Sequence, residues 1–142
     1  MIVAETIARL RALDPPAFRL VAGAVELAAI GKQPPATPAA YVVIEQEAAG
    51  ENDYVAGVLR QRVEADLAVV VVAANASDAT GAALALDIEA LKRRVRDALL
   101  GWTPPSGDDA ITYVGCEIAR AAPGYAVAQL TFSAPYYVEA TP

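Results

Sequence analysis

The chain has 142 residues, 56% of them hydrophobic, and a formal net charge of −6 at pH 7. We expect one domain over residues 1–142, because this length is enough for a hydrophobic core of its own. The acidic balance excludes a nucleic-acid binder that works by neutralising phosphates, although DNA could still slide past such a protein without sticking.

Most site chemistries are missing from the composition. The chain has no histidine and a single cysteine, Cys116, so an intramolecular disulfide, a zinc site and most hydrolase mechanisms are excluded. The two glycine-rich phosphate-binding motifs, GxGxxG and GxxxxGK(S/T), do not occur. We therefore expect no catalytic, cofactor-binding or metal-binding residue and no cofactor. We expect a protein that is not an enzyme.

Membrane and secretion signals are also missing. The longest apolar run, Leu67–Ala74, is far shorter than the ~20 residues that cross a bilayer. No basic segment precedes an apolar one at the N-terminus, so we expect synthesis in the cytosol and no membrane partner.

In chain order, four short segments come first. They are a helix over Ile2–Leu13, a strand over Phe18–Ala22, a helix over Ala24–Ile30 and an extended loop over Gln33–Pro38. Three prolines in the last segment exclude a regular helix there.

A hairpin follows. Strands are predicted over Tyr41–Glu47 and Val58–Val72, with a polar turn over Ala48–Asp53 between them. The second strand alternates apolar and charged residues over a length of roughly 45 Å, which is long for so small a domain. We expect either a bend near Glu64–Asp66 or a hairpin end that projects beyond the globule.

The longest predicted helix runs over Asp78–Leu100. Asn75 or Ser77 is its expected cap, and Gly101 ends it. Its apolar stripe is formed by Leu84, Ile88, Leu91, Val95 and Leu99.

Two further strands, Ile111–Arg120 and Tyr125–Val138, are joined by the turn Ala121–Gly124. The predicted fold is α+β: a mainly antiparallel mixed sheet, with one long helix (about 78–100) packed on a face and a short N-terminal helix.

Three conspicuous positions have structural interpretations. Cys116 alternates with Val114 and Ile118, which predicts a small buried hydrophobic residue. Trp102 is expected to pack at the helix end, with an interface anchor as a second possible role. The pair Asp108–Asp109 is expected in a solvated loop.

Charged residues gather in two places. Lys92, Arg93, Arg94 and Arg96 form either the solvated side of the helix, with Glu89 paired to Arg93, or a patch that meets an acidic neighbour. The second group is a strip of both signs that suits contacts between subunits as well as solvent. It is formed by Arg60, Arg62, Glu64 and Asp66.

The order of these elements resembles the tail terminator proteins of long-tailed bacteriophages. The resemblance rests on Gln61-Arg62-Val63 running into a valine-rich strand, on a long helix that ends at the turn Gly101–Pro105, and on a final hairpin with Leu130-Thr131-Phe132 and Tyr136-Tyr137. It covers about Phe18 to Val138, without a catalytic motif to match.

This resemblance implies a non-enzymatic homo-oligomer, a hexameric ring on the head-proximal end of the tail tube. The ring would stop tube polymerisation and offer the surface for head joining. Its partners would be the tube protein and a neck (head-tail connector) protein, with DNA passing through the lumen. It would lie in the virion tail after assembly in the host cytoplasm. Another neck or tail-completion protein is the alternative, and a small-ligand-binding or enzymatic α+β domain is a more distant one.

One region is expected to mediate assembly. A strand too long for its globule and an acidic turn over Gly50–Asp53 suggest segments that are ordered by neighbours. We therefore expect Glu45–Arg62 at or near a subunit or tube interface, in a closed ring whose lumen is not strongly basic.

Overall fold

The computed structural model describes residues 1–28, 36–54, 57–75, 81–122 and 124–141. A five-stranded mixed sheet has the order β1-β2-β3-β5-β4, in which only the β1–β2 pair is parallel. The strands are β1 (Leu20–Ala22), β2 (Ala39–Asn52), β3 (Leu59–Ala74), β4 (Thr112–Ala122) and β5 (Tyr125–Ala140). The helices are α1 (Ile2–Arg11), α2 (Ala24–Ala28) and α3 (Ala82–Leu99), so the predicted α+β fold is confirmed.

The main core lies between the sheet and the two longer helices. Odd-numbered residues of β3 point toward α3, as the period-two pattern predicts, and Leu67, Val69 and Val71 are fully buried. The helical stripe meets them with Leu84, Ile88, Val95 and Leu99. Leu91, predicted in the same stripe, is only half-buried.

The opposite face of the sheet carries a smaller apolar cluster. Tyr41, Val70 and Val72 are buried there, with Leu27 of α2 packed against them. Both faces of the sheet are therefore covered at this end, which explains why β3 becomes apolar at every position after Asp66.

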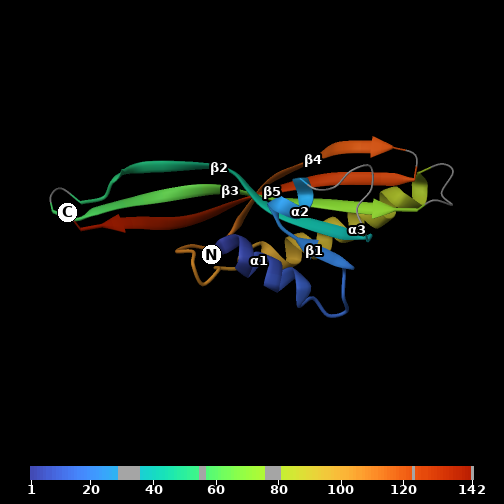
Figure 1. The fold of residues 1–142 in the computed structure, drawn as a ribbon, viewed down its shortest axis with the longest axis horizontal. Helices are drawn as coiled ribbons and strands as arrows, with labels where there is room; N and C mark the ends of the chain where they lie inside the picture. The colour runs from blue at the N-terminus through green and yellow to red at the C-terminus, as the bar shows by residue number, and fades with distance from the viewer. Residues whose placement is uncertain (29–35, 55–56, 76–80, 123, 142) are drawn as a thin grey trace.

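The sheet is much longer than the helices that cover it. In Figure 1, β2, β3 and β5 continue to the left beyond α1 and α3 as a three-stranded extension. We call this extension, residues 45–54, 57–66 and 134–140, the arm, and the remainder the body. Of the two alternatives for the long strand, the projecting hairpin is confirmed. A register shift in β2 at Glu45, opposite Leu67 and Asp66, marks the start of the arm.

The long helix starts later than predicted. Its first residue is Ala82, and its N-cap is Gly81, whose φ of 79° belongs to the left-handed region and cannot continue a helix. The expected cap Asn75 instead donates its N–H to the carbonyl of Gly124, at 2.9 Å, where β3 meets the β4–β5 turn. Ser77 and Asp78 lie outside the described residues.

The predicted turn over 48–53 is also wrong for most of its length. β2 continues through Asn52, because Ala48 and Ala49 pair with Glu64 and Val63 of β3. The chain turns only beyond Asn52, whose side-chain Oδ1 accepts the N–H of Arg60 at 2.8 Å. Of the predicted loop Gln33–Pro38, residues 33–35 lie outside the described residues, as do 29–30 of the second helix.

Candidate assembly interface

One face of the arm carries interlocked charges and an aromatic ring. The Arg60 guanidinium lies 3.7 Å from the centre of the Tyr137 ring, and Arg62 lies over the same ring at 5.9 Å. Arg60 Nε is 3.0 Å from Glu139 Oε1, an ion pair whose angles do not form a hydrogen bond. The mixed-sign strip is therefore largely satisfied within its own chain.

The base of the arm is fastened to the loop that follows α3. Arg62 donates to Glu64 Oε1 at 2.7 Å and to Asp109 Oδ2 at 2.8 Å, while Asp108 Oδ2 accepts the N–H of Tyr137 at 2.9 Å. The hydrogen bond from Arg62 holds the pKa of Glu64 below its ordinary value. Asp108–Asp109 lies in a loop, as predicted, but both carboxylates bind the arm.

The same loop also binds the first helix. The N–H and the hydroxyl of Ser106 donate to the two carboxylate oxygens of Glu5, at 2.9 and 2.6 Å, and these bonds lower the pKa of Glu5. The loop therefore joins α1 to the base of the arm.

The other face of the arm continues the core face of the sheet beyond the helices. Val63 is still buried near the base, whereas Leu59 and Val138 toward the tip are 46% and 42% exposed. Tyr136 donates its hydroxyl to Glu47 Oε1 at 2.7 Å on this side. All of β2 from residue 45 to residue 52 is exposed.

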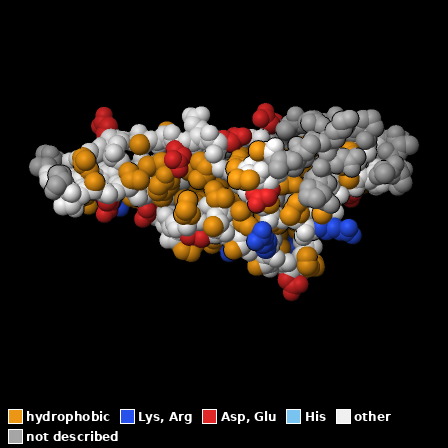
Figure 2. All heavy atoms as spheres, in the orientation of Figure 1, with side chains coloured by type: hydrophobic (Ala, Val, Ile, Leu, Met, Phe, Trp, Pro, Cys, Tyr) orange, Lys and Arg blue, Asp and Glu red, His pale blue; other side chains and the backbone are white. Residues whose placement is uncertain are grey.

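Charge is divided unequally between arm and body. The arm contains seven acidic residues and two arginines, a net charge of −5 out of −6 for the chain. In Figure 2, acidic side chains lie along the arm, while the basic groups visible on this face lie mainly over the body. The arm is thus an acidic projection from a nearly neutral body.

The basic cluster of α3 is partly used inside the chain. Glu89 was expected to pair with Arg93, four residues later. It binds Lys92 instead, three residues later, at 3.0 Å. Arg94 donates to the carbonyl of Pro15, and the Arg96 guanidinium lies 5.6 Å from the Tyr113 ring. Arg93 is exposed.

Trp102 packs against the main core at the end of α3, as predicted, and the Arg9 guanidinium lies 4.6 Å from its ring. Cys116 is half-buried against the core, but its predicted alternation with buried neighbours is wrong. Val114 and Ile118 are 63% and 61% exposed. A register shift between Tyr113 and Gly115 breaks the period of two, and β4 is the edge strand.

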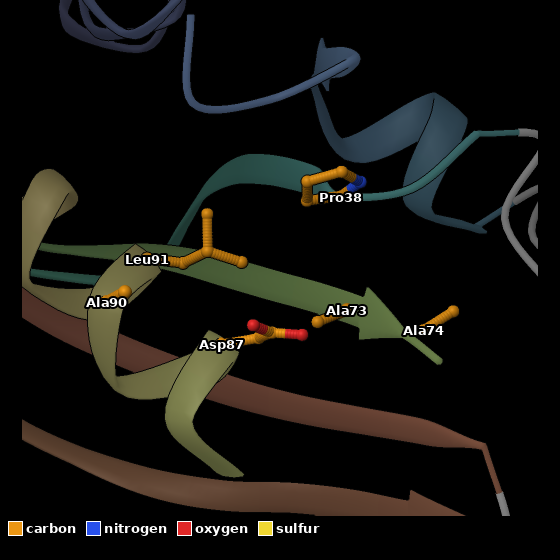
Figure 3. Close-up of a pocket in the computed structure, with 6 residues that line it drawn as sticks. All are labelled: Pro38, Ala73, Ala74, Asp87, Ala90 and Leu91. Carbon is orange, nitrogen blue, oxygen red and sulfur yellow. The ribbon is translucent and has the colours of Figure 1, made fainter. Parts of the chain in front are cut away.

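A hollow of about 320 Å³ lies between α3 and the end of β3. Figure 3 shows Asp87 and Leu91 of α3 facing Ala73, Ala74 and Pro38 across it. Asp87 is the one ionisable group among its described lining residues, so the hollow lacks the converging polar groups of a catalytic site.

The described residues also lack a metal-binding cluster and a membrane-spanning helix. They contain no group of three or more cysteine, aspartate or glutamate residues placed to hold a metal ion. None of the described helices is long and apolar enough to cross a membrane.

A comparison with known protein families gives a match for this chain. A family model described as "Phage tail terminator protein" matches residues 1–142, the entire chain. The chain belongs to the phage tail terminator protein family. This tail terminator is therefore a structural protein of the phage tail, and it associates with other tail and virion proteins.

Its fold also occurs in a solved virion. A chain of the structure titled "Virion of native gene transfer agent (GTA) particle" is 18% identical, with a TM-score of 0.60, and the similarity covers 96% of this chain and 95% of that one. A comparison with curated proteins gives no match.

The sequence predicted, as one of two alternatives, that the hairpin projects beyond the globule (Figure 1), but two other features of this surface were not predicted. The attachment of Asp109 to Arg62 joins residues 47 positions apart, and no local pattern signals it. The exposed edge of β4 was missed because Val114 and Ile118 were expected on the buried side of their strand. The edge position of β4 is set by the topology of the sheet, which no local pattern signals.

Proposed function

We propose that this tail terminator forms a closed ring, of six subunits, on the head-proximal end of the tail tube. The ring stops polymerisation of the tube and provides the surface on which the head joins. Its partners are further copies of itself, the tube protein and a neck protein. It assembles in the host cytoplasm and becomes part of the neck region of the virion.

The projecting arm is the observation that carries this proposal. From residue 45 to residue 52, β2 is exposed throughout, and the tip adds the exposed side chains of Tyr54, Leu59 and Val138. A small domain gains little stability by extending such strands into water. Contact with a neighbouring subunit or with the tube would bury them.

A closed ring explains why the tail terminator itself would not polymerise further. Identical head-to-tail contacts close on themselves when the rotation between subunits permits it, and no contact surface is then left for another copy. The arm's net charge of −5 suits a lumen past which DNA moves without binding, because an acidic wall repels phosphates. The role is structural, without catalysis.

The test shortens the arm without disturbing the body. Replacing residues 50–62 with Asn-Gly joins Ala49 to its partner Val63 through a two-residue hairpin turn. We expect native mass spectrometry to show a ring for the wild type and monomers for the variant, with a similar melting temperature. In tail assembly, the wild type should give tails of one length and the variant tails of irregular length.

Two outcomes would contradict the proposal. One is a wild type that stays monomeric in the presence of tubes, and the other is a shortened variant that still limits tail length. Labelled protein found beside the head, on tails that already end correctly without it, would favour another neck or tail-completion protein instead.

A further inference from the structure

The sheet has two open edges in each subunit. Beyond Tyr41, where its pairing with β1 ends, the outer side of β2 has no strand partner among the described residues. β4 forms the opposite edge and pairs only with β5 in the described part of the chain. Unpaired edges carry free N–H and C=O groups that readily bind another strand.

The β4 edge carries two exposed apolar side chains, Val114 and Ile118, together with the exposed Glu117, and it lies beside basic residues. Ile118 pairs with Ala128, a member of the main core, so its side chain is on the α3 side of the sheet, yet it is 61% exposed. Arg96 of α3 lies over Tyr113 of β4. Arg93 is exposed three residues earlier, and therefore on the same side of the helix.

The β2 edge has the opposite character. Its exposed part carries Glu45, Glu47 and Glu51, with Ala48, Ala49 and Gly50 between them. Small side chains allow a second backbone to approach, and the carboxylates match the arginines beside the β4 edge.

We propose that the outer edge of β2, Val43–Asn52, pairs with the outer edge of β4, Thr112–Ala122, of the next copy of this chain. This inference rests on the proposed ring and names the surfaces that close it. The contact is head-to-tail, because each subunit contributes a different edge to its two neighbours.

The direction of pairing follows from the sheet itself. β2 and β4 are separated by three antiparallel pairings, so they run in opposite directions within one subunit. A neighbour that continues the sheet in the same orientation therefore adds its strand antiparallel. The free part of β2 lies in the arm and β4 lies in the body, so the arm of one subunit crosses the body of the next.

Cysteine cross-linking tests this pairing in the full chain. In a Cys116→Ser background, Val114→Cys is combined in turn with a single cysteine at each position from 44 to 51. Oxidation of the assembled rings should give cross-links at alternate β2 positions, because side chains alternate along a strand. The products should be a ladder of covalent oligomers that ends at the ring size.

The controls separate this inference from the proposed ring. If Val114→Cys alone gives covalent dimers, the β4 edges pair with each other and the inference is wrong. Rings that form without any β2–β4 cross-link would also overturn it, while leaving the proposed ring intact. Failure of the wild type to form rings would overturn both.

A charge exchange provides a second test. Glu51→Lys and Arg93→Glu should each raise the dissociation constant of the ring about tenfold, a change of about 1.4 kcal/mol. The double variant should return the dissociation constant to near its wild-type value. Arg19→Glu, an exposed position beside β1, is the matched control and should restore nothing when combined with Glu51→Lys. Equal restoration by both doubles would show an effect of net charge alone and contradict the proposed contact.

Discussion

Three strands, β2, β3 and β5, run through both the body and the arm (Figure 1), but the two regions differ in what surrounds these strands. In the body, α1 and α3 cover one face of β2, β3 and β5, and α2 covers part of the other. In the arm, strand pairing continues without a break between β3 and β5, from Val63–Tyr136 to Leu59–Ala140, but no helix follows. Strand pairing and core formation are therefore separable along one sheet.

The difference indicates that the body provides most of the stability, and in the proposed ring the arm provides a contact for assembly. Large buried side chains such as Tyr41, Phe132 and Leu99 lie in the body, and the hydrophobic contribution to folding depends on such burial. The strands of the arm pair with one another but bury few large side chains, and its ion pairs are exposed, so the arm should contribute less to stability. Changes in the core of the body should therefore affect folding, whereas changes in the arm or beside the β4 edge should affect assembly.

The largest expected effect is on the body core. Val95 is fully buried in the stripe of α3, so Val95→Asp should cost on the order of 4 kcal/mol or more by burying a charge without a partner. Leu86→Asp is the matched control, because Leu86 is 73% exposed on the same helix. Urea unfolding should show a large loss of stability for Val95→Asp and near wild-type stability for Leu86→Asp. Equal free energies of unfolding for the two variants would contradict this account of α3.

A smaller effect is expected where α1 meets the end of α3. Arg9 donates to the carbonyl of Ala98 and stacks on Trp102, so Arg9→Ala should lower the free energy of unfolding by about 1–2 kcal/mol. Arg19→Ala, on an exposed arginine, is the control. Thermal unfolding that does not distinguish the two would show that the Trp102 contact contributes nothing.

Arg62 tests the base of the arm. Its side chain is 37% exposed, so Arg62→Ala should cost less than about 1 kcal/mol of stability despite the loss of two ion pairs. Because the arm loses its link to Asp109, assembly should be impaired far more than folding. A variant that melts several degrees lower but still assembles normally would reverse the proposed division between arm and body.

The smallest effect is a dependence on pH at the same place. The folded-state pKa of Glu64 lies below its ordinary value of 4.5, mainly because Arg62 donates to it. The resulting stability is present above pH 4.5 and is lost as the pH falls through the lowered value. Glu64→Gln should therefore be less stable than the wild type by under about 0.5 kcal/mol at pH 6, and the difference should shrink as the pH falls through the lowered pKa of Glu64. A difference in urea titrations that stays constant as the pH is lowered through the acid range would exclude this cause.

Local patterns predicted the body better than the arm. The alternation of Leu67, Val69 and Val71 and the helical spacing of Ile88 and Val95 identified core positions, since burial in the body follows the strand and helix periods.

The remaining features depend on partners distant in sequence. Residues 48–52 have the composition of a turn, but they form a strand because β3 offers them pairing groups. The left-handed Gly81 delays the helix, and a register shift at Val114 interrupts the pairing of β4 with β5; neither leaves a periodic trace in the sequence. The hydrogen bond from Arg62 to Asp109 could not be predicted, because it depends on the loop geometry that brings the two side chains together.

Hydrogen exchange of the assembled protein against its monomer tests the central claim most directly. If the arm mediates assembly, those amides of residues 43–52 that do not already bond to β3 should become strongly protected in the ring, while the amides of β3 in the body, already buried, should change little. Protection that appears on assembly only in α1 or α3, with residues 43–52 exchanging as freely as in the monomer, would contradict the account.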